Sequence, residues 1–261
     1  MNPNAPIRIQ RCIRGRCHRA GSPRKAFRLL WAVALFTGCA AQTGIQRIDP
    51  SLTAADLRTG KVAVLGVVQF QEPDQIRPPL IAMLEKTFRE ERSDVTMIPA
   101  DSVRSILGAE RDKKLLLGYE YQGELDGHAL EEIAGSVRGI ARYILVARVD
   151  RDRTRNVTRG VDVNDTTSAA HVLYETGVTE REARVTVQLY DLSRRALAVS
   201  ARYEGSTENE HPMLSPLGRI SFVPKGIPPE ERGYPETPAL ALALREPFQT
   251  FARTLPGAPK R

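Results

Sequence analysis

Few residues of this 261-residue chain fall into the patterns that catalytic or metal sites require. There is no GxSxG turn, no GxxxxGK[ST] loop, no HExxH pair and no CxxC pair. His128 follows Glu124 and Asp126, but Asp126 fits a helix cap better than an acid–base group. The segment 162–173 begins like a calcium loop and lacks the required glycine and final glutamate. We therefore expect no catalytic, cofactor-binding or metal-binding residue, no cofactor, and no enzymatic activity.

The positions of the cysteines indicate a site of covalent modification. The chain has three, Cys12, Cys17 and Cys39, and the first two fall in a segment that we expect to be removed. The mature chain would then hold a single cysteine and no internal disulfide. A lone thiol in an oxidising compartment is a liability unless it is chemically capped, so Cys39 is expected to be modified.

Cys39 closely follows a short apolar segment. Residues 29–36 are all apolar, and the basic residues Arg24, Lys25 and Arg28 precede them. A positive flank, a short apolar core and small residues at the end are the parts of a secretory signal peptide. A membrane-spanning helix needs about 20 apolar residues, so the segment is too short to span. We expect residues 1–38 to act as a signal peptide.

The residues around the cysteine, Phe36-Thr37-Gly38-Cys39, resemble the lipobox of bacterial lipoproteins. The usual leucine of that motif is displaced to Leu35. The resemblance implies cleavage between Gly38 and Cys39, attachment of diacylglycerol and palmitate-type chains to Cys39, and a membrane anchor. Alanine after the cysteine, where many inner-membrane lipoproteins have aspartate, favours the outer membrane, facing the periplasm, over the inner membrane. An ordinary signal peptide with a chance cysteine is the alternative.

The basic charge of the chain belongs to this N-terminal segment. Residues 1–38 hold eight basic residues and no acidic one. Without these eight, the 38 basic residues of the chain become 30 against 31 acidic residues, a net charge of about −1. A nucleic-acid partner is therefore not expected.

Hydrophobic periodicity predicts an α/β fold, a mixed sheet with helices packed on it. We expect a lipidated tether at 39–60 with a helical turn at Ala54–Leu57, an α/β periplasmic domain at 61–205, and an irregular Pro/Gly-rich segment with a C-terminal helix at 206–261. Strands are predicted at 62–68, 95–98 and 143–147. Pro78-Pro79 are predicted to open a helix, and Asp101 and Asp126 are each predicted to cap one. Alternating residues at 183–190 and 197–203 predict an antiparallel hairpin that follows the strand–helix repeats.

This order of elements resembles the periplasmic domain of the curli-secretion channel lipoprotein and of lipoprotein activators of penicillin-binding proteins. The resemblance covers residues 61–205 and includes the hairpin that carries Asp191-Leu192. It implies a non-catalytic binding or assembly factor with an envelope protein partner, and it is compatible with an oligomer. A cell-envelope hydrolase or transferase with an unrecognised site, and a subunit of an outer-membrane secretion channel, are the alternatives.

Overall fold

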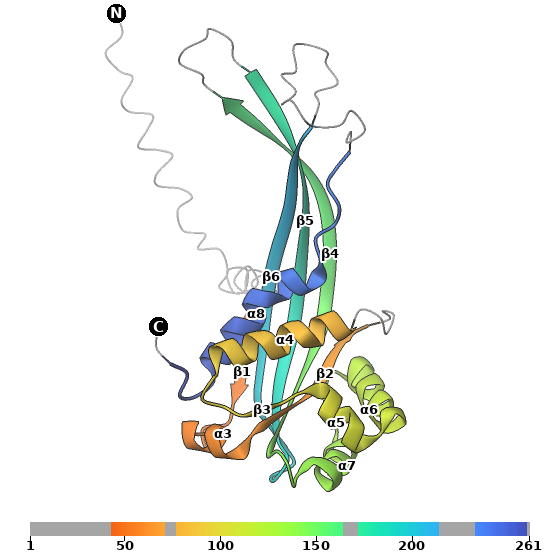
Figure 1. Ribbon diagram of the computed structural model, residues 1–261, viewed down its shortest axis with the longest axis vertical. Coiled ribbons are helices and arrows are strands. Elements are labelled where there is room, and N and C mark those ends of the chain that lie inside the picture. Colours follow the sequence, from red (N-terminus) through yellow and green to blue (C-terminus); the bar gives the residue numbers. More distant parts are fainter. Residues whose placement is uncertain (1–42, 71–76, 164–171, 214–232, 260–261) are drawn as a thin grey trace, which may run out of the picture. The chain divides into compact units, whose positions relative to one another are not determined.

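A mixed six-stranded sheet forms the centre of the molecule, in the order β1-β6-β5-β4-β2-β3 (Figure 1). The computed structural model describes residues 43–70, 77–163, 172–213 and 233–259, which belong to one unit that starts at Thr43. The predicted fold class is confirmed: helices pack on a sheet with parallel and antiparallel pairs. The strands are β1 (Gly44–Ile48), β2 (Val62–Gln69), β3 (Met97–Ile98), β4 (Tyr143–Val163), β5 (Val172–Asp191) and β6 (Ala196–Met213).

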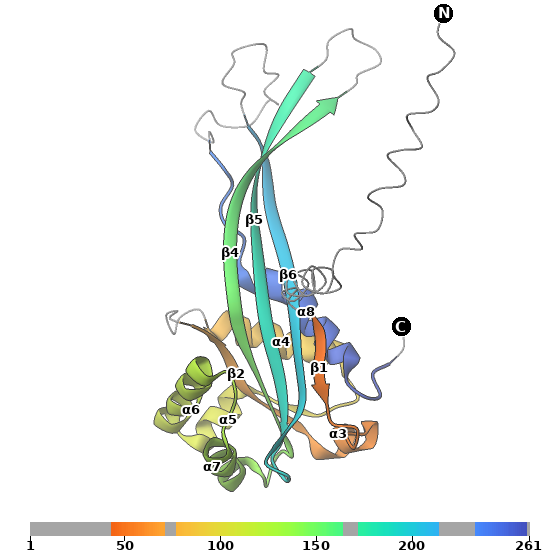
Figure 2. The ribbon, with the colours of Figure 1, turned by 180° about the vertical axis from the view of Figure 1, so that it is seen from behind.

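The helices of the described residues divide between the two faces of the sheet. They are α3 (Ala54–Gly60), α4 (Arg77–Glu91), α5 (Ala100–Leu107), α6 (Ala109–Gln122), α7 (Gly127–Val137) and α8 (Leu240–Thr254). Apolar side chains of α3, α4 and α8 form one core cluster with the sheet, and those of α5, α6 and α7 form a second cluster. Figures 1 and 2 show α4 and α8 on one side of the sheet and α6 and α7 on the other.

Strand β2 lies between these two cores. Every residue from Val62 to Gln69 is buried, as expected for a β-branched apolar run that faces helices on both sides. It pairs in parallel with β3 and β4. The chain therefore crosses from β2 through α4 to β3, and from β3 through α5–α7 to β4, as strand–helix repetition predicts.

The last three strands continue well beyond the helices (Figure 2). β2 stops pairing with β4 at Val149, and the register of β4 with β5 shifts between Val149 and Arg151. Such an irregularity bends a strand and increases its twist. We call the part beyond this point the strand extension; it comprises residues 151–163 of β4, 172–184 of β5 and 204–213 of β6.

The prediction of a tether at 39–60 is wrong for residues 44–60, which contain β1 and α3. β1 pairs with β6, and Thr53 caps α3 through a reciprocal hydrogen-bond pair with Asp56. Leu52 and Leu57 are buried in the first core cluster. The helical turn predicted at Ala54–Leu57 is part of α3. Strand β1 escaped prediction because it has no apolar face: Gly44 is half-buried and the other four residues are exposed.

Three further expectations need correction. Pro99, not Asp101, occupies the N-cap position of α5, and Asp101 lies in its first turn. The strand predicted at 143–147 continues to Val163, and residues 207–213 belong to β6 instead of an irregular segment. Residues 214–232 lie outside the described part of the chain. The C-terminal helix is present as α8 and contains Pro247.

None of the helices in the described ranges combines the length and apolar character needed to cross a membrane.

Candidate functional site

The residues of the predicted lipid site, Gly38 and Cys39, lie outside the described residues, so their modification stays a prediction. The cap predicted at Asp126 is present: its Oδ1 accepts a hydrogen bond from the Ala129 N–H at 2.7 Å. His128 is exposed in the first turn of α7. In the ranges that the structure describes, no three His, Cys, Asp or Glu side chains are grouped so that they could hold a metal ion.

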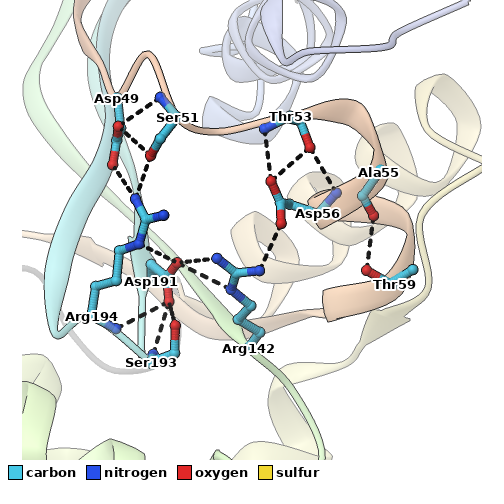
Figure 3. A network of polar contacts seen from close by, with 10 residues as sticks. All are labelled: Asp49, Ser51, Thr53, Ala55, Asp56, Thr59, Arg142, Asp191, Ser193 and Arg194. Carbon is cyan, nitrogen blue, oxygen red and sulfur yellow. Dashed lines mark hydrogen bonds and ion pairs between the residues drawn. The ribbon is translucent and has the colours of Figure 1, made fainter.

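A polar network joins the chain after Cys39 to the end of the sheet (Figure 3). Arg142 donates to Asp56 at 2.8 Å and to Asp191 at 2.8 and 3.1 Å. Arg194 binds Asp49 at 3.0 Å and also contacts Ser51. Two arginines thus tie the β1–α3 segment to the start of β4 and to the β5–β6 turn.

Hydrogen bonds keep the carboxylates of this network ionised. Burial by itself would raise the pKa of Asp191, but donors on Arg142 and Ser193 outweigh it and the pKa is lowered. Hydrogen bonds from Thr53, followed by that from Arg142, lower the pKa of Asp56. The network is therefore charged at neutral pH, and it holds the N-terminal segment of the domain in one position.

An Arg142→Ala chain is expected to lose about 2 kcal/mol of unfolding free energy, measured by chemical denaturation, because Asp191 is only 5% exposed and would lose its charged donor. Arg58→Ala is the matched control. Arg58 is 54% exposed in its pair with Asp94, and loss of an exposed ion pair costs about 0–1 kcal/mol. Equal losses for both variants would contradict this role of Arg142.

One face of the strand extension carries a row of ion pairs. Arg155 of β4 binds Glu180 of β5 at 2.5 Å, and Arg159 binds both Glu180 and Glu208 of β6 at 2.7 Å. Arg184 of β5 binds Glu204 of β6 at 2.5 Å. These residues share a face because directly paired residues of antiparallel strands point the same way.

The opposite face of the extension is covered by the chain that leads into α8. Thr179 Oγ1 donates to the Pro235 carbonyl at 2.6 Å, and Arg181 donates to the Pro238 carbonyl at 3.0 Å. Asn209 donates to the Glu236 carbonyl at 2.8 Å. Of its two faces, the charged one is therefore free of these contacts.

The two outer strands of the extension have open edges. β2 pairs with β4 no further than Val149, and β1 pairs with β6 no further than Arg202. Beyond these points no described strand pairs with the outer side of β4 or β6. An open strand edge presents backbone N–H and C=O groups that can pair with another chain.

The outer strands also differ in charge. On β4, the charged face of the extension carries Arg151, Arg153, Arg155 and Arg159, and on β6 it carries Glu204, Glu208 and Glu210. Within the described residues, neither Arg153 nor Glu210 has an ion pair, so each charge is available to a partner. The arrangement can bind a chain of complementary charge.

The sequence contains a signal for this surface in the spacing of its charged residues. Arg151, Arg153 and Arg155 stand at alternate positions, and so do Glu180 and Glu182. Period two is the spacing of a strand face. Because these positions are charged, the apolar periodicity that indicates the other strands does not extend to them.

Comparison with known proteins finds similar solved structures, at low sequence identity. No protein-family model matches the chain, and no curated protein matches it. Among solved structures, PelC from Paraburkholderia phytofirmans, a dodecamer, has 20% sequence identity and a TM-score of 0.34, with coverage of 63% of this chain and 80% of PelC.

Two further solved structures are similar at the same level. Lipoprotein GNA1162 from Neisseria meningitidis has 12% identity and a TM-score of 0.31, with coverage of 57% of this chain and 84% of that protein. The hypothetical protein CT253 from Chlamydia trachomatis has 13% identity and a TM-score of 0.32, with coverage of 56% and 72%. At these values the likeness carries no conclusion about family or function.

Proposed function

We propose that this chain is a lipid-anchored envelope protein that acts without catalysis, as a binding and assembly factor. The N-terminal signal and the lipobox-like residues support export and attachment of lipid to Cys39. Alanine at position 40 supports the outer membrane, with the domain in the periplasm. The strand extension supplies the surface through which the protein assembles.

The folded domain starts very close to the proposed lipid. β1 begins at Gly44, and the five residue steps from Cys39 to Gly44 span at most about 17 Å when fully extended. The network around Arg142 then fixes residues 49–56 against the sheet. A domain on so short a link stays at the membrane surface, which favours work on partners that are held there too.

The observation that carries the assembly role is the pair of open edges with opposite charge. Strand β4 of one copy can lie beside β6 of the next, because both edges are unpaired in the described residues. Both strands run antiparallel to β5, so the new pair would be parallel. Such a head-to-tail contact uses two different surfaces and joins copies into rings or filaments. A second copy of this chain is therefore the partner that fits.

An Arg153→Glu chain is expected to self-associate about tenfold more weakly, because a like charge would then face the acidic β6 edge. Glu210→Arg should have the same effect from the other edge. Sedimentation velocity of the membrane-extracted protein in detergent measures both. Arg138→Glu and Glu124→Arg make the same charge changes at exposed residues on the helical side and should leave association within about twofold.

A protein that sediments as a monomer at micromolar concentration would contradict self-assembly. Self-assembly through the strand extension would also be contradicted if Arg153→Glu and Glu210→Arg both associated like the parent. In either case, capture of a different envelope protein by the same surface would identify the partner instead.

A further inference from the structure

A cleft of about 430 Å³ lies beside the edge of β2 that carries the short strand β3. In the strand order of the sheet, this edge is at the opposite end from β6. β3 pairs with β2 only at Val62 and Ala63, so the edge of β2 beyond these residues has no strand partner in the described residues. Leu65 of β2 lines the cleft, with residues of α4, α5 and α6 around it. The assembly surface of the strand extension contributes no residue to it.

The topology makes this a switch point of the sheet. The connection after β2 goes to α4 on one face, and the connection after β3 goes to α5 on the other face. In open α/β sheets, ligands bind in the crevice at the carboxyl ends of strands where the connections diverge in this way. The cleft is lined by the first residues of three helices, Arg77 of α4, Ala100 of α5 and Ala109 of α6.

Asp112 of α6 lines this cleft and is 7% exposed. Its Oδ1 atom is buried and has no hydrogen-bond partner in the described residues. Buried polar atoms are nearly always paired, so an exception calls for an explanation such as a bound water, ion or other ligand. Burial raises the pKa of the Asp112 carboxyl despite the lowering effect of Arg104 and Arg77. A donor placed here would satisfy the carboxylate.

The surroundings of Asp112 narrow the chemistry of that donor. No group of three acidic, His or Cys side chains is present among the described residues to hold a metal ion. Both signs of charge line the cleft: Arg77, Arg104 and Lys113 are basic, and Glu85, Asp101, Glu110 and Asp112 are acidic. A ligand that carries one charge of each sign matches such a lining better than a simple cation or a simple anion. Glu85 already occupies the α5 N-terminus, since its Oε1 accepts from the Ala100 N–H at 2.7 Å.

We infer that this cleft binds a small zwitterion of the α-amino-acid type. Its ammonium group would donate to Asp112, and its carboxylate would lie against Arg104 and Lys113. Both charges of the ligand would then be paired inside a cleft large enough for a molecule of this size. No reaction is implied, and the ligand would serve as a bound signal or stabilising group.

Isothermal titration of the full membrane-extracted chain tests this, with glycine, L-alanine, L-aspartate and L-lysine as probes. At least one probe should bind saturably, and acetate and methylamine, which lack one of the two charges, should bind at least about tenfold more weakly. Asp112→Asn and Arg104→Ala should each weaken binding of that probe by at least about tenfold. Glu110→Gln, at an exposed acid on the same cleft, should change it less than about twofold.

Asp112→Asn should fold at least as stably as the parent in the absence of ligand, because a carboxyl with a raised pKa costs stability when it ionises. Arg104 is exposed, so its variant gives a second test that does not disturb the core. The inference is overturned if no probe binds up to about 10 mM, if methylamine or acetate binds as well as the best amino acid, or if both variants bind like the parent. Self-association is measured separately, so either proposal can fail alone.

Discussion

A Cys39→Ser chain, given a cleavable signal peptide, is expected to move from the membrane fraction to the soluble periplasmic fraction. Each buried methylene of an acyl chain contributes about 0.8 kcal/mol, and stable anchoring takes two chains or more. The variant loses all of them at once, so the expected change is a nearly complete redistribution. Fractionation followed by a high-salt wash and immunoblotting measures it.

Cys12→Ser and Cys17→Ser provide the matched control. Both cysteines lie in the predicted signal peptide, so their loss should leave the mature protein in the membrane fraction. Retention of Cys39→Ser in the washed membrane would show that something other than this lipid holds the protein there.

Gly205→Ala is expected to lower the free energy of unfolding by about 3 kcal/mol. A Cβ at this position of β6 would lie 2.0 Å from the Ala243 carbonyl oxygen and 2.7 Å from Pro247 Cγ, both in α8. Because one of these contacts is with backbone, the helix itself must move away from the sheet. Chemical denaturation measures the loss, and a lower transition midpoint should accompany it.

Gly118→Ala is the control with the opposite expected sign. Gly118 lies inside α6, and an added Cβ there meets nothing within 4 Å. Alanine in place of glycine in a helix interior should stabilise the chain by about 0.5–1 kcal/mol. If Gly205→Ala were as stable as the parent, the close packing of α8 on β6 would be wrong.

The elements that could be predicted from sequence are those whose structure is determined by their own residues. The apolar run of β2 and the alternating residues of the β5–β6 hairpin each match a single period, and both are found where expected. Asp126 caps α7 through a local hydrogen bond. The elements that local patterns did not predict in full depend on distant partners. β1 is held by pairing with β6, and α3 is held by Leu57 in the core and by Arg142, the residue before β4.

The candidate surfaces were harder to predict for the same reason. The arginines of β4 and the acids of β5 and β6 lie about 20–50 residues apart in sequence, and only the register of three long strands brings them together. Asp112 reads in sequence as one more charge in the run Glu110-Arg111-Asp112-Lys113-Lys114. Its burial follows from the packing of α6 near β2 and α4, which no local pattern encodes.

The anchor at Cys39 is the claim on which the proposed membrane role rests, and intact-mass spectrometry of the membrane-extracted protein tests it most directly. The account predicts a chain that begins at Cys39 and carries the added mass of diacylglycerol or of three acyl chains, removable in part by ester hydrolysis. A mature terminus at any other residue, or a Cys39 of unmodified mass in the membrane fraction, would contradict it.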